Sequence, residues 1–398
     1  GVPGALIRVL FSCSAFLPLG ALPGERSVDR HNVVHTRAVS EEAVPKQQRG
    51  TRGCEPIDAG ERPVPTDVKH LHPGDIKVVM ALGDSITAAF GAAGFSSGLS
   101  EARGMSWSAG AGEGAHTLPN LVKLYSKDVW GGSVGSHKAE ICYGPVCPGS
   151  YLPEQDRLNA AQSGAMVRNL AGQVDYLAGQ LWATGNMGKW KLATLFIGAN
   201  DVCTMCGKAV EGAAAGAVLD AYEAELRAAV TQMRLRIPRL FLSVVPVFNI
   251  SQVYEFTRGV AWCEEVHLGL PIECECAFTP RPPAEAAARR RDMDAGAEGT
   301  RERTERVVDQ MRRVAAGDPH FAVVLQPGLS ETDFLGGGFP RPGAVSDLDC
   351  FHPSALSHEY MATALWNNLL APAALKKRRV DPRDTAACPN ATSLLQVF

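Results

Sequence analysis

Five short segments with the pattern of buried strands most constrain what this chain can fold into. They cover residues 76–82, 157–161, 192–198, 240–247 and 321–326. Segments with helical spacing of apolar residues alternate with them, at residues 167–182, 218–235, 284–314 and 354–370, the last with Ser354 as a candidate cap. This alternation predicts an α/β fold with a parallel sheet whose two faces are both covered by helices.

Composition narrows the class of protein. The chain has 398 residues and 45% of them are hydrophobic, which is ample for a buried core and excludes wholesale disorder. Its 39 basic and 42 acidic residues nearly cancel, which argues against a dedicated nucleic-acid binder. No uninterrupted apolar run reaches the roughly 20 residues of a membrane-spanning helix, so no transmembrane anchor is expected in this chain.

The N-terminal segment has the pattern of a secretory signal. In residues 5–22 one Arg precedes an apolar stretch, and small residues and then charges follow. We expect a signal peptide over residues 1–23, and therefore a secreted or secretory-pathway protein. A buried helix is the alternative. A polar extension is expected over residues 24–72 and a C-terminal tail over residues 373–398.

The cysteines favour disulfide bonds. The chain has 11, and removal of Cys13 with the signal would leave an even ten. Cys203 and Cys206 also have the spacing of half a zinc site, for which Cys142/Cys147 or Cys274/Cys276 could supply the second pair. Glycosylation sequons at Asn249 and Asn390 agree with the signal and with an oxidising compartment, so disulfides are preferred, with their connectivity left open.

Three groups of residues suggest nucleophilic catalysis. Ser85 follows the first predicted strand in Gly-Asp-Ser, which alone is ordinary turn composition. Asn200 follows another strand, where its amide could donate to a developing oxyanion or merely cap a helix. His352 can serve as a base near neutral pH, and Asp349, three residues earlier, can fix its tautomer. All of these residues lie at predicted strand ends. As a set they indicate nucleophilic catalysis much more specifically than any one of them does alone.

On these residues the chain resembles the SGNH hydrolases, a superfamily also named for its GDSL motif, and within it the phospholipase B-like branch. The resemblance covers about residues 76–370 and rests on the following stretches: VVMALGDSITAAFGA, RGMSWSAGAGEGAHTLPNL, LNAAQSGAMVRNL, WKLATLFIGANDVCTMC and DCFHPSALSHEYMATALWNNLL. Ile86 stands where the motif's name has leucine. The resemblance implies a three-layer α/β/α, flavodoxin-like fold with a single catalytic domain over residues 73–372.

The resemblance also implies a role for each motif residue. Ser85 is the expected nucleophile, His352 the base, and Asp349 its orienting partner. The oxyanion hole is expected from the backbone N–H groups of Ser85 and Gly164 and the side-chain amide of Asn200. A side chain at Gly164 could block the close approach of the acyl oxygen. No metal and no organic cofactor are expected.

The implied function is a secreted serine esterase or lipase that releases fatty acid from phospholipids and lysophospholipids through an acyl-enzyme. A carboxylesterase acting on acetylated carbohydrate or another small ester is the alternative enzyme. A catalytically inactive extracellular binding protein is the alternative from another class. The expected partner is a lipid or small ester, including lipid at a membrane surface, and no oligomeric state is predicted.

Candidate substrate contacts come from the Gly-rich region that follows the nucleophile. Phe90, Trp107 and His116 are the candidates, because open α/β sheets bind ligands beyond the carboxyl ends of their strands. The apolar neighbours Met105 and Leu118 could line the same groove. Packing beneath the loop is the alternative for each of them.

Overall fold

The computed structural model of the protein describes residues 54, 63–142, 144, 146–206, 213–269, 274–278 and 282–397. These residues belong to a unit that spans residues 48–398. The signal peptide predicted over residues 1–23 lies outside the described residues, as does most of the extension predicted over residues 24–72.

The central sheet has four parallel strands in the order β1-β4-β5-β6. The strands are β1 (Val78–Gly83), β4 (Lys191–Phe196), β5 (Leu240–Val245) and β6 (Phe321–Leu325). All four were expected from their apolar runs. The strand expected at residues 157–161 is wrong, because only Asn159 bridges to β1, at Ala81. The chain turns there, with Arg157 at a φ of 49° and the Asn159 side chain accepting from the Ala161 N–H.

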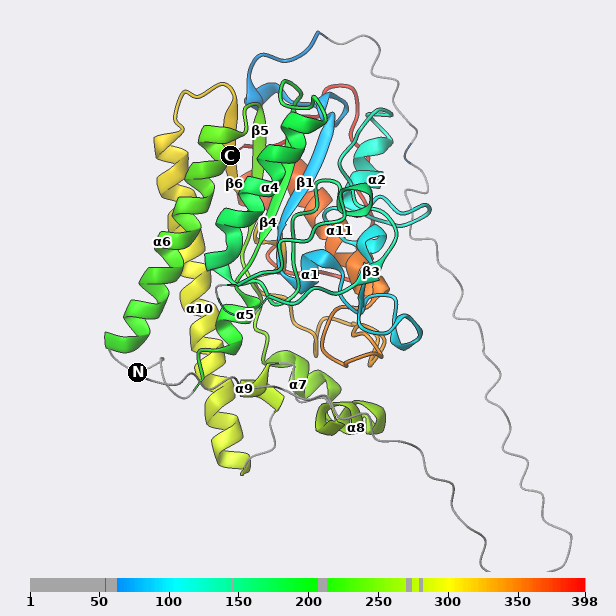
Figure 1. Ribbon diagram of the computed structural model, residues 1–398, viewed down its shortest axis with the longest axis vertical. Helices are drawn as coiled ribbons and strands as arrows, with labels where there is room; N and C mark the ends of the chain where they lie inside the picture. Colours follow the sequence, from blue (N-terminus) through cyan, green and yellow to red (C-terminus); the bar gives the residue numbers. More distant parts are fainter. Residues whose placement is uncertain are drawn as a thin grey trace, which may run out of the picture. The chain divides into compact units, whose positions relative to one another are not determined.

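Both faces of the sheet are buried, because successive side chains of each strand enter different cores. On β1, Val78, Met80 and Leu82 pack against α4 (Leu170–Ala183), α6 (Ala213–Arg236) and α10 (Pro283–Val314). Val79, on the other face, packs with α2 (Leu118–Lys123) and α11 (Ala355–Leu370). Figure 1 shows α4, α6 and α10 on one side of the sheet and α2 and α11 on the other. These three layers confirm the predicted α/β/α fold.

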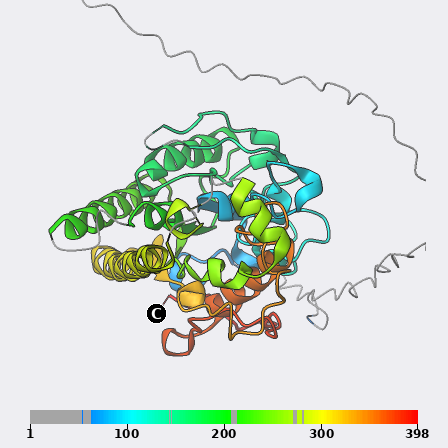
Figure 2. The same ribbon diagram turned by 90° about the horizontal axis from the view of Figure 1, so that it is seen from below.

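Shorter elements gather beyond the carboxyl ends of the strands. The helices are α1 (Ser85–Ala88), α3 (Pro153–Asp156), α5 (Ala199–Cys203), α7 (Gln252–Thr257), α8 (Ala261–Gly269) and α9 (Glu275–Phe278). A small antiparallel sheet pairs β2 (Ser100–Glu101) with β3 (His137–Lys138). Helices α7 and α8 lie beyond this end of the central sheet in Figure 1, and in Figure 2 they lie in front of it. Ser85 and Asn200 follow β1 and β4 at the same end.

The 3-10 turns complete the described elements, at Val68–His70, Pro73–Asp75, Phe95–Ser97, Arg103–Met105, Val167–Asn169, Pro327–Leu329 and Ala373–Leu375. Ser354 caps α11 as predicted, since its side chain accepts from the Ser357 N–H. Among the described helices, none combines the length and the apolar character needed to cross a membrane.

Both ends of the described chain pack against the sheet layers. Val68 and Leu71, from the predicted extension, are buried, and so are Val380 and Leu395 from the predicted tail. The Leu395 N–H donates to the Leu71 carbonyl at 2.8 Å. The Cys54–Cys388 disulfide closes the same region. Residues placed outside the catalytic domain by sequence thus contribute to its core.

Candidate active site

Ser85 occupies a tight turn between β1 and α1. Asp84 caps the helix, with its Oδ1 accepting from the Ile86 N–H at 3.0 Å. A Cβ at Gly83 would come within 2.4 Å of the Phe196 carbonyl oxygen and 2.7 Å of the Thr87 Oγ1. Only glycine therefore fits at the turn, which places Ser85 at the carboxyl end of the strand.

Ser85, His352 and Asp349 form a hydrogen-bonded chain. The His352 Nε2 lies 2.7 Å from the Ser85 Oγ, and its Nδ1 lies 2.6 Å from the Asp349 Oδ2. The other carboxylate oxygen of Asp349 accepts from the N–H groups of Phe351 and His352 at 2.9 and 3.0 Å. The side chains of all three members are buried. This geometry brings together residues that are 267 positions apart in the sequence.

The electrostatics keep Asp349 ionised. Burial alone raises the pKa of this carboxyl, but the charge and hydrogen bond of His352, together with the two backbone N–H groups, outweigh burial. The pKa of Asp349 therefore lies below its usual range. An ionised carboxylate at this position favours a proton on the Nδ1 of His352, which leaves Nε2 to accept a proton from Ser85.

Gly164 lies on a loop held against the end of β1. The Gln162 N–H donates to the Gly83 carbonyl at 3.2 Å. Gly164 has a φ of 76°, and a Cβ there would come within 2.7 Å of the Cys142 carbonyl oxygen. Local backbone geometry therefore requires glycine here, which is a different reason from the approach of an acyl oxygen that the sequence suggested.

Asn200 reaches the Gly164 loop from the neighbouring strand. It lies on α5, four residues after Phe196, which pairs with Gly83 in the β1–β4 register. Its Nδ2 donates to the Ala165 carbonyl at 2.9 Å. The sheet thus brings Ser85, Gly164 and Asn200 to one edge.

Two of the three candidate substrate contacts, Trp107 and His116, pack in the core, which is the alternative that the sequence left open for them. Trp107 has no exposed surface and packs edge-on against Phe196. His116 is 8% exposed and its Nε2 lies 2.8 Å from the Thr363 Oγ1 on α11. Phe90 is also buried, but its ring centroid lies 4.8 Å from that of His352. Leu118 is fully buried as well, whereas Met105 is 40% exposed.

Sequence reasoning missed an exposed aromatic pair beside the catalytic loop. The Phe95 and Trp262 rings meet edge to face at 5.6 Å, with side chains 60% and 44% exposed. Both residues bind Asp347, two positions before Asp349: the Phe95 N–H donates to its Oδ1 at 2.7 Å and the Trp262 Nε1 to its carbonyl at 2.8 Å. Nothing in the sequence signals this pairing, because it joins segments 167 residues apart.

The ten cysteines that remain after Cys13 form five disulfides, which excludes the zinc alternative. The pairs are Cys54–Cys388, Cys142–Cys147, Cys203–Cys274, Cys206–Cys276 and Cys263–Cys350. In the ranges covered by the structure, no three His, Cys, Asp or Glu side chains gather as a metal site would need. Four of the five disulfides lie next to the site: Cys350 follows Asp349, Cys203 and Cys206 follow Asn200, and the Cys142 carbonyl abuts Gly164.

The carboxyls of buried Asp84 and half-buried Asp201 and the buried imidazole of His358 support the site without joining the hydrogen-bonded chain. Burial raises the pKa of Asp84 to about 7 and that of Asp201 to about 6. Each accepts from a backbone N–H, of Ile86 and Val167 respectively. Burial, with the nearby charge of His352, lowers the pKa of His358 to about 3, and its Nδ1 accepts from the Trp107 N–H.

The two sequons differ in accessibility. Asn390 is exposed at a turn. Asn249 is half-buried, and its side-chain oxygen accepts from Arg301 on α10. Of the two predicted glycosylation sites, Asn390 is therefore the more open to modification.

Comparisons with known proteins identify relatives. The model of the family described as GDSL-like Lipase/Acylhydrolase matches residues 79–365. "Phospholipase B1, membrane-associated" from Rattus norvegicus is 31% identical over 340 residues, which cover 82% of this chain and 22% of that protein. The protein of the same name from Homo sapiens is 29% identical over 343 residues, which again cover 82% of this chain and 22% of that protein.

The solved structure of an extracellular lipase from Streptomyces rimosus aligns with a TM-score of 0.33 and 17% identity, over 73% of this chain and 98% of that one. The chain itself spans about a fifth of the length of the curated relatives it matches.

Proposed function

Because the chain belongs to the GDSL-like lipase/acylhydrolase family, we propose that it is a secreted serine esterase that releases fatty acid from phospholipids and lysophospholipids. Family membership confirms the predicted SGNH superfamily, its phospholipase B-like branch and the enzyme class, carboxylic ester hydrolase. The observation that carries the proposed mechanism is the Ser85–His352–Asp349 chain, with contacts of 2.7 and 2.6 Å.

In the first step, the Ser85 Oγ attacks the ester carbonyl carbon while the His352 Nε2 takes its proton. The charge that develops on the imidazole is stabilised by Asp349, whose carboxylate lies 2.6 Å from Nδ1. His352 then gives the proton to the leaving alcohol, and the acyl group stays on Ser85. Water, activated by the same histidine, attacks the acyl-enzyme and releases the fatty acid.

The developing oxyanion is assigned to three donors. They are the N–H groups of Ser85 and Gly164 and the side-chain amide of Asn200. One N–H of that amide donates to the Ala165 carbonyl, which fixes the orientation of the amide and leaves its second N–H for the oxyanion. Donors that are fixed before the reaction need no reorganisation when charge develops, which is why they accelerate it.

Two features support a lipid substrate, and a third supports an oxidising compartment. The exposed Phe95–Trp262 pair beside the catalytic loop offers apolar surface to an acyl chain. The curated relatives carry the name phospholipase B1. Five disulfides fit a protein outside the reducing cytosol, which supports secretion.

A panel of phospholipids, lysophospholipids and short-chain esters tests the proposal, with products identified by mass spectrometry. The wild-type protein should release fatty acid, and a fluorophosphonate probe should label Ser85. Ser85→Ala should abolish both while circular dichroism shows an intact fold. Equal turnover by the wild type and the folded Ser85→Ala protein would refute the mechanism. Release only of short acyl groups would refute the lipid substrate.

A further inference from the structure

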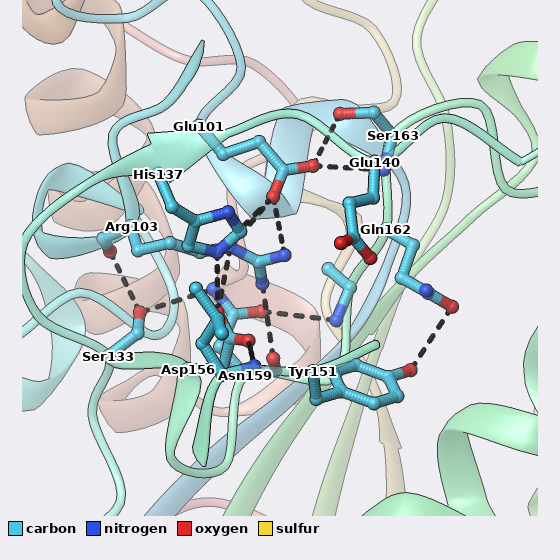
Figure 3. A network of polar contacts seen from close by, with 12 residues as sticks. Glu101, Arg103, Ser133, His137, Glu140, Tyr151, Asp156, Asn159, Gln162 and Ser163 are labelled. Carbon is cyan, nitrogen blue, oxygen red and sulfur yellow. Dashed lines mark hydrogen bonds and ion pairs between the residues drawn. The ribbon is translucent and has the colours of Figure 1, made fainter. Parts of the chain in front are cut away.

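A buried cluster of charges lies behind the loop that carries Gly164. Its members are Glu101 on β2, Arg103 just after it, His137 on β3 and Asp156 at the end of α3 (Figure 3). The side chains of Glu101, Arg103 and Asp156 are 1–3% exposed. Burying charged side chains costs free energy unless each charge is paired and hydrogen-bonded. The partners of each charge in this cluster therefore matter.

Glu101 connects the cluster to the residue before Gly164. Its Oε1 accepts from the Ser163 N–H at 3.2 Å and from the Ser163 Oγ at 2.6 Å. Its Oε2 accepts from the Arg103 Nε and Nη2 at 3.0 and 2.6 Å. Arg103 thus holds one carboxylate oxygen, and the other is fully available to Ser163.

Ser163, the residue before Gly164, is therefore held on both sides of its Cα. The Ser163 carbonyl accepts from the Cys142 N–H at 2.7 Å, while Glu101 holds the Ser163 N–H and Oγ. In a trans peptide the C=O and the next N–H point in opposite directions. The bond to Cys142, together with the anchoring of Ser163 by Glu101, therefore sets where the Gly164 N–H points, and within the described chain that N–H has no hydrogen-bond acceptor.

The same cluster is fixed relative to the nucleophile. The backbone of Glu101 bridges to Phe90, and the Ala102 N–H donates to the Ala89 carbonyl at 2.9 Å, directly after α1. Arg103 donates from Nη1 to the Asn159 carbonyl, and the Asn159 Nδ2 donates to the Thr87 carbonyl on α1, each at 3.2 Å. Two short paths thus connect the helix that begins with Ser85 to the loop that presents Gly164.

We propose that Glu101, held in place by Arg103, is a positioning residue that fixes the Gly164 N–H relative to the Ser85 hydroxyl. The inference rests on the proposed function, since it concerns the oxyanion hole of that reaction. A glycine at a φ of 76° has wide conformational freedom, so an anchor on the preceding residue restricts the N–H that must meet the oxyanion.

Glu101→Gln tests the proposal with a short-chain ester. The variant should lower kcat roughly 10- to 100-fold with little change in KM, since a misplaced donor weakens transition-state binding and not substrate binding. Affinity for a trifluoromethyl ketone, which forms a tetrahedral oxyanion on the serine, should fall by a similar factor. Ser163→Ala, which keeps its N–H donor, should have a smaller effect.

Glu223→Gln is the matched control. Glu223 is also buried and ion-paired with arginines, Arg227 and Arg303, but lies between α6 and α10. The Glu223→Gln variant should have a lower melting temperature than the wild type but the same kcat. If Glu101→Gln does not fold, Glu101→Asp keeps the negative charge beside Arg103 but shortens the reach to Ser163, so this variant should fold and should still show the loss of kcat.

The outcomes separate the two proposals. A folded Glu101 variant with wild-type kcat and wild-type ketone affinity would overturn the positioning role, provided that the wild-type protein shows Ser85-dependent turnover. Absence of that turnover in the wild type would overturn the proposed function, and the positioning role with it.

Discussion

Among single residues, His352 shows most directly how the fold shapes the chemistry. Both of its ring nitrogens have partners, Ser85 and Asp349. The Phe90 and Phe351 rings pack against its ring in T-shaped contacts, with ring centroids 4.8 and 5.1 Å away. Phe90 was expected to contact substrate, but its buried ring packs on the imidazole. The ring of His352 is therefore held in the orientation that proton transfer requires.

Asn200→Ala should lower kcat by about 10²–10³ with little change in KM, because the amide acts on the oxyanion of the transition state. Steady-state kinetics with a short-chain ester measure both constants. Asn186→Ala is the control, since Asn186 is a buried asparagine that precedes β4, at the opposite edge of the sheet from the site. An unchanged kcat in folded Asn200→Ala would remove Asn200 from the oxyanion hole.

At the scale of elements, strands were easier to predict than the segments between them. A fully buried parallel strand must be a short apolar run, which the sequence shows for β1, β4, β5 and β6. Residues 157–161 lie beside β1 without the regular backbone of a strand, because the Asn159 side chain bonds to nearby backbone. The same sequence patterns also predicted that Ser85 and Asn200 follow strands and that His352 precedes the last long helix, α11.

The loops around the site could not be predicted, because their contacts join distant segments. Trp107 and His116 were expected to line a substrate groove, but in the structure both form hydrogen bonds with residues of α11. Phe95 and Trp262 become neighbours because both bind Asp347 and because the Cys263–Cys350 disulfide ties α8 to the same loop. The pairing of Glu101 with Ser163 likewise depends on how β2 meets the Gly164 loop.

The aromatic pair formed by Phe95 and α8 leads to a prediction on substrate length. Phe95→Ala and Trp262→Ala should lower kcat/KM for long-chain esters by roughly 10-fold while leaving short-chain esters nearly unaffected, since each buried CH₂ contributes about 0.8 kcal/mol. Trp182→Ala is the control, because Trp182 is 78% exposed but lies at the far end of α4. Equal loss at every chain length would contradict a role for the pair in acyl binding.

For the molecule as a whole, His137 should make stability depend on pH. Its hydrogen bond to Asp156 raises the pKa of His137 above 6.5, with burial opposing the shift. Its ring faces the carboxylates of Asp156 and Glu101, at 2.9 and 3.8 Å, and the nearby positive charge of Arg103. A raised folded-state pKa stabilises the folded protein fully below the unfolded value and loses that stabilisation as pH rises through the folded value.

The melting temperature of the wild type should therefore exceed that of His137→Gln most clearly below about pH 6.5, and the difference should shrink at higher pH. Differential scanning calorimetry of both proteins from about pH 5.5 to 8.5 measures this. A difference that stays constant, or that grows with pH, would show that His137 does not stabilise the fold as a cation.

The connectivity of the disulfides could not be predicted from the sequence, because ten cysteines allow many pairings. The bond between Cys54 and Cys388 joins positions 334 residues apart, so nearly the entire folded unit lies within one covalent ring. A protease that cuts the backbone once inside this ring produces two pieces that remain tethered through sulfur. Such a nicked molecule would gain only the mass of one water, and its fragments would come apart only after a thiol reduces the disulfides.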